Sequence, residues 1–173
     1  MSKNNKISDI DSKASIELCE ITMKNFRECI DLSVAEDQRG FVASNMYSLA
    51  EAKADGVSNP LAIYSGDTMV GFIMYCFDAA SSIGYIDRLM VAADHQRRGY
   101  GRAAMAEVTS RLRNTPGCLV IRTSFDPTNV VADALYHSLG FRKTGEIDHG
   151  EIVVVLEVDA KEQENSVAAT KIV

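Results

Sequence analysis

The sequence predicts a single α/β domain built around a mixed β-sheet. Segments in which apolar and polar residues alternate are interleaved with segments of helical apolar spacing, in the order β-α-α-β-β-β-α-β-α-β-β. Two pairs of strands are separated by short turns that contain glycine, as in β-hairpins. With 173 residues, 46% apolar and 24% charged, the chain has the length and composition of one globular domain. The order of elements fits neither a doubly wound parallel sheet nor a closed barrel.

The first third of the chain predicts one strand followed by two helices. Residues 15–22 alternate apolar and polar side chains, which is typical of a strand. Residues 25–32 have the apolar spacing of a short helix, and the acidic residues 34–40 indicate a loop. Residues 41–54 predict a second helix. Its apolar stripe is expected to consist of Val42, Met46, Leu49 and Ala50.

The middle of the chain predicts three consecutive strands. Residues 61–64 and 69–77 are mostly apolar, and a Ser-Gly-Asp turn joins them into a hairpin. Residues 84–91 form the next strand, in which Asp87 is a charged residue among apolar ones.

The rest of the chain alternates helix and strand before it closes in a second hairpin. Residues 100–113 are rich in alanine, with larger apolar residues on one side, and a Pro-Gly pair stops this helix. A strand is expected at 118–123, and a helix from residue 126 to the glycine at 140. Residues 143–147 and 151–158 predict the final hairpin.

Charge and cysteine usage exclude several classes of protein. The 24 acidic residues outnumber the 18 Lys and Arg, for a net charge of −6, which disfavours nucleic acid and favours a cationic partner. No apolar run approaches the roughly 20 residues that cross a membrane, and the polar N-terminus does not resemble a signal peptide. The four cysteines have no spacing typical of a zinc site or a disulfide framework. We therefore expect a cytoplasmic protein without a metal. Residues 1–14 and 159–173 are expected to be flexible tails.

A glycine-containing loop between the strand at 84–91 and the helix at 100–113 predicts an anion site. Gly99 and Gly101 let the backbone approach a ligand closely, and the first N–H groups of a helix lack partners within it. Arg97, Arg98 and Arg102 add positive charge, so a pyrophosphate would fit. The alternative is a tight β–α turn with solvated arginines. The loop is not a P-loop, since no Lys-Ser/Thr pair follows the glycines, and the next strand lacks the acidic residue of a dinucleotide motif.

Two motifs resemble a known family. Residues 96–101 (Gln-Arg-Arg-Gly-Tyr-Gly) match the Q/R-x-x-G-x-G/A signature of the GNAT superfamily of acetyl-CoA-dependent N-acetyltransferases. Asn129, Tyr136 and the Leu-Gly-Phe at 139–141 match its second motif. The resemblance covers residues 15–158. It implies a single-domain GNAT fold with a mixed, mostly antiparallel central sheet flanked by helices, acetyl-CoA as co-substrate, and assembly as a homodimer or larger homo-oligomer.

The resemblance also implies roles for individual residues. Tyr136 is expected to protonate the departing thiolate after direct attack by the amine, whereas without the motif it would be taken for a half-buried packing residue. A backbone N–H of the strand at 89–91 is expected to stabilise the oxyanion. The expected coenzyme-binding residues are Leu89, Met90, Val91, Gln96, Arg97, Arg98, Gly99, Tyr100, Gly101, Arg102 and Asn129.

A narrower resemblance is to bacterial diamine and spermidine/spermine acetyltransferases. It depends on residues 34–38, 41–45, 48–52, 60–64 and 69–75. It implies a small-molecule amine, a polyamine or diamine, as acceptor. The strand at 84–88 (Gly-Tyr-Ile-Asp-Arg) departs from the Tyr-Trp-Ile of those enzymes on the acceptor side. The candidate carboxylates for the ammonium groups are Glu36, Asp37, Glu51 and Asp87, with solvated surface charges as the alternative.

Several chemical assignments stay open at the level of sequence. Glu36, Asp37 and Asp87 are candidates for the general base, although Asp87 and Arg88 could form a structural pair. His95 and His137 flank the motifs without metal-ligand spacing. The rival functions are acetylation of an aminoglycoside, an amino acid or a protein N-terminus, and a sensor that binds acetyl-CoA without turnover.

Overall fold

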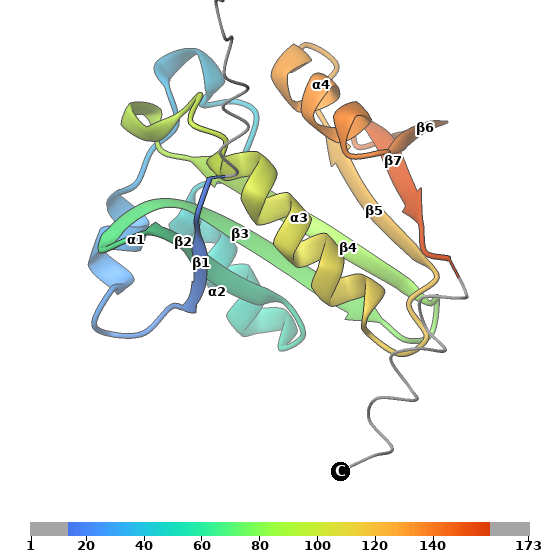
Figure 1. The fold of residues 1–173 in the computed structure, drawn as a ribbon, viewed down its shortest axis with the longest axis horizontal. Coiled ribbons are helices and arrows are strands. Elements are labelled where there is room, and N and C mark those ends of the chain that lie inside the picture. Colours follow the sequence, from blue (N-terminus) through green and yellow to red (C-terminus); the bar gives the residue numbers. More distant parts are fainter. Residues whose placement is uncertain (1–13, 160–173) are drawn as a thin grey trace, which may run out of the picture.

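The computed structural model describes residues 14–159 and contains seven strands, four α-helices and two 3₁₀ turns in the expected order (Figure 1). The predicted tails lie outside the described residues, apart from residues 14 and 159. The first half comprises β1 (Glu17–Glu20), α1 (Phe26–Asp31), η1 (Glu36–Gln38), α2 (Asn45–Asp55), β2 (Asn59–Ser65), β3 (Thr68–Asp78) and β4 (Ile83–Val91). The second half comprises η2 (Ala93–His95), α3 (Tyr100–Arg113), β5 (Val120–Phe125), α4 (Val130–Ser138), β6 (Arg142–Asp148) and β7 (Glu151–Glu157).

The strands form one mixed sheet in the order β1-β2-β3-β4-β5-β7-β6. Every neighbouring pair is antiparallel except β4 and β5, which are parallel. A parallel pair needs a crossover connection, and α3 supplies it. The predicted mixed sheet and both predicted hairpins are therefore confirmed.

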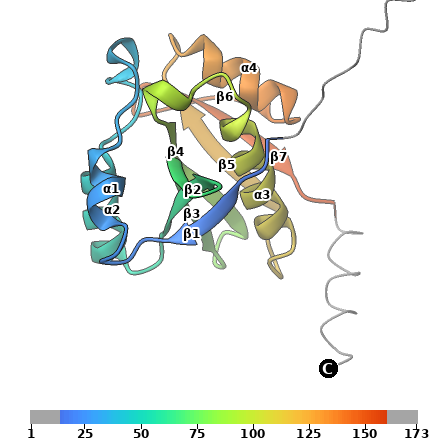
Figure 2. The same ribbon diagram turned by 60° about the vertical axis from the view of Figure 1, so that its left-hand side comes forward.

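Helices cover both faces of the sheet (Figure 2). α3 and α4 pack on one face, over an apolar cluster that includes Ile73, Val108 and Ile121. α1 and α2 pack on the other face, over a smaller cluster that includes Phe72 and Met74. From Phe72 to Tyr75, successive residues of β3 alternate between the two clusters, because side chains of a strand point to opposite faces.

The second helix differs from its prediction in both its start and its buried face. α2 begins at Asn45, where the Ser44 side chain caps it by accepting a hydrogen bond from the Tyr47 N–H at 3.2 Å. Met46, expected to be buried, is 59% exposed. The fully buried residues of α2 are instead Asn45, Ser48 and Ala52. The predicted stripe is confirmed at Val42 and Leu49, which pack against the smaller apolar cluster, and wrong at Met46 and Ala50, which are exposed. Tertiary hydrogen bonds, such as that from the Asn45 amide to the Cys29 carbonyl at 2.8 Å, place polar residues inward instead.

The fourth helix begins later than predicted. Residues 126–128 form a turn in which Asp126 accepts a hydrogen bond from the Thr128 N–H at 2.7 Å. Asn129 is the N-cap of α4 and accepts from the Ala132 N–H at 3.0 Å. The predicted end of this helix is close to the observed one, since Gly140 has the positive φ of a residue that follows a helix. The predicted range of α3 agrees with the observed one, Tyr100–Arg113.

The centre of the sheet has two irregularities that shape the functional site. β4 and β5 are paired only over residues 83–85 and 120–122, and beyond this point the two strands separate. In the β3–β4 ladder, Met74 pairs with Arg88 and Tyr75 with Ile86, so Asp87 is the extra residue of a β-bulge. The Thr123 hydroxyl donates to the Ile86 carbonyl at 2.8 Å and bridges the strands at the point of separation.

The described residues include no helix with the length and apolarity needed to cross a membrane. All four cysteines are free thiols, two of them buried.

Candidate active site

A cavity of about 1010 Å³ lies at the separation of β4 and β5. The end of β4, the loop after it and the start of α3 form one side, and the end of β5 with α4 forms the other. Ligand pockets commonly span roughly 300–1000 Å³, so this one suits a large ligand. The sequence-predicted residues that line it are Asp87, Leu89, Met90, Val91, Gln96, Arg97, Gly99, Tyr100, Gly101, Arg102, Asn129 and Tyr136.

The loop between β4 and α3 has the geometry of an anion-binding site. Arg97 and Gly99 both have positive φ, and Gly99 is the N-cap of α3 without a side chain to cap it. The first hydrogen bond of the helix runs from the Ala103 N–H to the Gly99 carbonyl at 3.0 Å. The N–H groups of the preceding turn thus have no acceptor within the helix, and the helix dipole adds positive potential there.

Gly101 keeps this side of the cavity open. A Cβ on Gly101 would lie 3.6 Å from a Val91 methyl group and 4.0 Å from methyl groups of Leu89 and Leu135. All three neighbours line the cavity, so a side chain at this position would project into the space available to a ligand. The free N–H groups, the absent side chain and the arginines together fit the pyrophosphate and pantetheine of coenzyme A.

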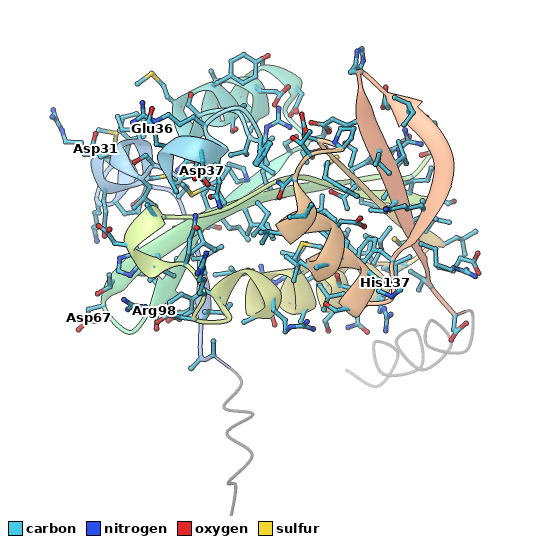
Figure 3. The ribbon with its side chains drawn as sticks, turned by 90° about the horizontal axis from the view of Figure 1, so that it is seen from above. Asp31, Glu36, Asp37, Asp67, Arg98 and His137 are labelled. Atoms are coloured by element: carbon cyan, nitrogen blue, oxygen red, sulfur yellow. The ribbon has the colours of Figure 1, made fainter. Side chains whose placement is uncertain are left out.

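The three arginines of the motif lie in different surroundings. Arg97 and Arg102 line the cavity, and the Arg102 guanidinium donates to the Ser138 hydroxyl of α4 at 2.6 Å. Arg98 does not line the cavity and donates to the Asp94 carbonyl at 3.1 Å. Figure 3 places Arg98 at the N-terminal end of α3. Arg98 therefore contributes to the charge and shape of the loop from outside the cavity.

Tyr136 is held rigidly at the point where the strands separate. It is 7% exposed and packs between Phe125 and Phe141, with ring centroids 5.7 and 5.8 Å away. Burial raises the pKa of the Tyr136 phenol above its usual value, a hydrogen bond with Thr123 opposes the rise, and the Glu151 carboxylate adds to it. The phenol is therefore protonated at neutral pH and can act as a hydrogen-bond donor in the cavity.

Asp87 is the predicted carboxylate that lies at the cavity. Its Oδ2 atom is buried, and no group among the described residues donates a hydrogen bond to it. Burial raises the pKa of Asp87, although Arg88 and a hydrogen bond with Cys76 partly offset the rise. Arg88 bonds to Asp87 through the main chain and not through the carboxylate: its guanidinium donates to the Asp87 main-chain carbonyl at 2.8 Å. The same guanidinium donates to the Glu51 carboxylate at 2.8 Å.

The other three predicted carboxylates do not line the cavity. Glu36 and Asp37 are exposed on η1 (Figure 3), and Glu36 forms an ion pair with Arg39 at 2.9 Å. Glu51 lies on α2 in its ion pair with Arg88. His95 lines the cavity, whereas His137 is exposed on α4, far from η1 in Figure 3.

The structure adds residues that the sequence reasoning missed. Thr123 and Phe125 contact Tyr136 from β5, and their alternation with half-buried neighbours places them on one face of the strand. Glu151 lines the cavity and accepts a hydrogen bond from the Ser124 hydroxyl. Asp148 also lines it, but is paired with Arg122 at 3.2 Å. No local pattern marks these two carboxylates, because the pairing of β7 with β5, and of β6 with β7, brings them to the site.

The chain belongs to the acetyltransferase (GNAT) family, whose pattern matches residues 17–141, and it is an acetyl-CoA-dependent N-acetyltransferase. Its relatives include the spermine/spermidine N(1)-acetyltransferase of Bacillus subtilis (strain 168), 29% identical over 151 residues that cover 83% of this chain and 99% of the relative. Among solved structures, spermidine N-acetyltransferase from Vibrio cholerae in complex with CoA and spermine has a TM-score of 0.68 at 13% identity, covering 86% of this chain and 97% of that one. A dodecameric structure of spermidine N-acetyltransferase from Vibrio cholerae has a TM-score of 0.64 at 14% identity, covering 85% and 95%. The predictions of the family, the GNAT fold and the enzyme class are confirmed.

Proposed function

We propose that the chain transfers acetyl from acetyl-CoA to a primary amine of a polyamine or diamine such as spermidine or spermine. The observation that carries this proposal is a cavity lined both by the cationic glycine loop and by carboxylates that have no ion-pair partner in the described part of the chain. Asp87 and Glu151 both line it, and neither forms an ion pair among residues 14–159. The named activity of the Bacillus relatives supports the same class of acceptor.

The coenzyme occupies the side of the cavity formed by β4 and the glycine loop. Its pyrophosphate meets the free N–H groups at the start of α3, with Arg97 and Arg102 as counter-charges. The pantetheine arm extends along Leu89, Met90 and Val91, at the edge of β4 that β5 leaves open. Asn129 and Tyr136 face the coenzyme from α4.

The open edge of β4 supplies the oxyanion donor. The Ala92 N–H bonds to the Val70 carbonyl of β3 at 2.9 Å, whereas the Val91 carbonyl points the other way and accepts from the Gln96 side chain at 3.0 Å. In a strand, the N–H and C=O of one residue point to the same edge and successive residues alternate. The N–H groups of Val91 and Leu89 therefore face the cavity, where either can stabilise the tetrahedral intermediate.

The transfer begins when a neutral amine attacks the thioester carbonyl carbon and forms the C–N bond. The C–S bond then breaks, and the departing thiolate accepts a hydrogen bond from the Tyr136 phenol, with transfer of its proton. A phenol is ordinarily a weaker acid than a thiol, and burial raises the pKa of Tyr136 further. Tyr136 therefore acts as a fixed phenol whose hydrogen bond to sulfur strengthens as negative charge develops there, and along which its proton is transferred.

Asp87 is the proposed base that receives the proton from the amine, directly or through water. It lies on β4 at the cavity, and burial raises its pKa toward the range in which a carboxylate accepts a proton more readily. Glu36, Asp37 and Glu51 are assigned to the more distant ammonium groups of a long polyamine. The enzyme is proposed to be cytoplasmic and to assemble as a homodimer or larger homo-oligomer, as a dodecameric fold neighbour does.

A panel of amines tests the acceptor. We expect thiol release from acetyl-CoA with spermine, spermidine and short diamines, and little or none with an aminoglycoside, free amino acids or a peptide with a free N-terminus. Release with one of the latter three and not with polyamines would contradict the proposed acceptor. Coenzyme binding without release for any amine would instead identify a sensor.

Replacing Tyr136 by Phe tests the acid. The change removes one hydroxyl and almost no volume, so the packing against Phe125 and Phe141 is retained. We expect kcat to fall by about 10²–10⁴-fold, the usual range for general acid catalysis, with little change in the Kd for acetyl-CoA. A purely structural tyrosine predicts nearly full kcat with a lower melting temperature. A variant within twofold of the wild-type kcat removes Tyr136 from the mechanism.

A further inference from the structure

The segment before α2 and the glycine loop are joined by a pair of glutamines that lie 58 residues apart in the sequence. The Gln96 Nε2 donates to the Gln38 Oε1 at 2.7 Å, and the Gln38 Nε2 donates back to the Gln96 Oε1 at 3.3 Å. Both residues line the cavity. A third hydrogen bond, from the Ala93 N–H to the Ser33 carbonyl at 3.0 Å, joins the same two segments.

The orientation of the Gln96 amide follows from its third partner. Its Nε2 also lies 3.0 Å from the Val91 carbonyl, which can only accept a hydrogen bond. The nitrogen must therefore face Val91, and its second hydrogen is the one directed at Gln38. Both hydrogens of the Gln96 amide are thus used within the protein. Its role is to connect the glycine loop with the open edge of β4 and with η1.

Few other interactions hold η1 in place. It has no buried residue and no side-chain cap at its N-terminus, and Glu36 and Asp37 are exposed. Its neighbours Val34, Phe41 and Val42 line the cavity, together with Gln38 itself. Val34 and Val42 also pack against the apolar cluster under α1 and α2, which holds the two ends of this segment. The position of η1 between them therefore depends on the contact with the glycine loop, where the coenzyme pyrophosphate is proposed to bind.

We propose that Gln38 is a positioning residue that couples occupation of the coenzyme site to the ordering of residues 34–41. This inference rests on the proposed function in one respect, since the ligand whose affinity is affected is the acceptor amine. Coenzyme binding fixes the glycine loop, Gln96 transmits that position to Gln38, and the ordered segment completes the acceptor side. The coupling is reciprocal, because each ligand changes the affinity of the other by the same factor.

The test uses the full chain, coenzyme A and spermine, with Gln38→Ala as the variant. Calorimetry gives the Kd of spermine without and with saturating coenzyme A. We expect wild type to bind spermine about fivefold or more tightly when coenzyme A is present. The ratio of the spermine Kd without coenzyme A to that with coenzyme A should fall to near one in Gln38→Ala. Gln38→Glu retains the acceptor of the 2.7 Å bond and is expected to keep part of the ratio.

Asn59→Ala is the matched control. Its amide also makes two hydrogen bonds, to the Val57 and Tyr75 carbonyls, but it lies outside the cavity and is expected to keep the wild-type ratio. A wild-type ratio of one, or an unchanged ratio in Gln38→Ala, overturns the proposal.

Hydrogen exchange with coenzyme A alone separates this inference from the proposed acceptor. We expect coenzyme A to slow amide exchange at residues 34–41 in wild type and in Asn59→Ala, but not in Gln38→Ala. This readout needs no amine, so it holds even if the panel contradicts a polyamine acceptor. Equal protection of the segment in wild type and Gln38→Ala, or none in either, overturns the coupling.

Discussion

Asp87 is a residue whose surroundings are set by a local irregularity of the backbone. The bulge between β3 and β4 leaves it without a partner in the ladder and directs its carboxyl into a partly buried position at the cavity. Arg88, the nearest cation, forms its ion pair with Glu51 instead. The result is a carboxylate that is costly to ionise in the folded protein, as expected of a group retained for function.

Replacing Asp87 by Asn is expected to change the pH dependence of stability. The folded-state pKa of Asp87 is raised, mainly by burial, so its favourable contribution exists below the unfolded pKa and is lost as the pH rises through the folded pKa. The melting temperature of Asp87→Asn minus that of wild type should therefore become more positive from acidic to neutral pH. Thermal unfolding at a series of pH values measures this difference, and 1 kcal/mol corresponds to roughly 2–4 °C.

The same variant tests the base. If Asp87 accepts the amine proton, kcat/KM for spermine falls by about 10²–10⁴-fold while the protein is at least as stable at neutral pH. The stability prediction is contradicted if the melting temperature of Asp87→Asn minus that of wild type decreases from acidic to neutral pH. That result would show that the buried carboxylate is favourably paired when ionised.

At the scale of secondary structure, the site depends on the separation of two neighbouring strands. Because β5 leaves β4 after three residue pairs, the edge of β4 is unpaired in the middle of a sheet, where its polar groups would normally be satisfied. Thr123 and Gln96 satisfy the carbonyls of Ile86 and Val91 at the two ends of the gap. Between them, main-chain N–H groups stay available to a substrate. α3 begins at the same opening and directs its free N–H groups toward it.

Substitution of Gly101 tests the coenzyme side of this arrangement. A branched side chain in Gly101→Val enters the space between Val91 and Leu135, so binding of acetyl-CoA should be abolished while the melting temperature changes little. Gly101→Ala serves as the graded control, since its Cβ makes only ordinary contacts and should weaken binding less. Calorimetry with acetyl-CoA measures both, and unchanged affinity in Gly101→Val would exclude this loop from the coenzyme site.

At the scale of the whole molecule, one cavity is lined by charged groups of both signs. The chain has a net charge of −6, yet the arginines of the glycine loop make the coenzyme side positive. Asp87 on β4, Asp148 on β6 and Glu151 on β7 line the same cavity, and so do Arg88 and Arg122. The proposed anionic coenzyme and cationic amine would each be attracted to the lining groups of opposite charge within this one cavity.

The carboxylates in this lining predict a salt dependence that increases with the charge of the acceptor. Raising the ionic strength from about 50 mM to about 500 mM shortens the screening length from roughly 14 Å to roughly 4 Å. We expect kcat/KM for spermine to fall by roughly tenfold over this range, and kcat/KM for a monoamine to change by less than about twofold. Steady-state kinetics at fixed saturating acetyl-CoA make the comparison. Equal salt dependence for the two amines would argue against recognition by the acidic surface.

The sequence alone determined the features that depend on neighbouring residues. The order of elements, the two hairpins, the limits of α3 and the glycine loop all follow from periodicity, turn residues and helix-stop signals within a few positions. The motif spacing also placed Tyr136 and Asn129 at one site, because both belong to α4 or its cap. These predictions hold because the physical preferences that they use are local.

Only the tertiary structure decided which polar side chains face the cavity. Asp87 reaches it through a bulge, and Glu151 through the pairing of β7 with β5, whereas Glu36 and Asp37 are turned to solvent although they lie near the same wall. The buried polar face of α2 and the Gln38–Gln96 pair were likewise invisible in the sequence. For Asn45 and Gln38 the physical reason is the same, because a distant part of the chain supplies the hydrogen bond, and that partner has no fixed spacing in the sequence.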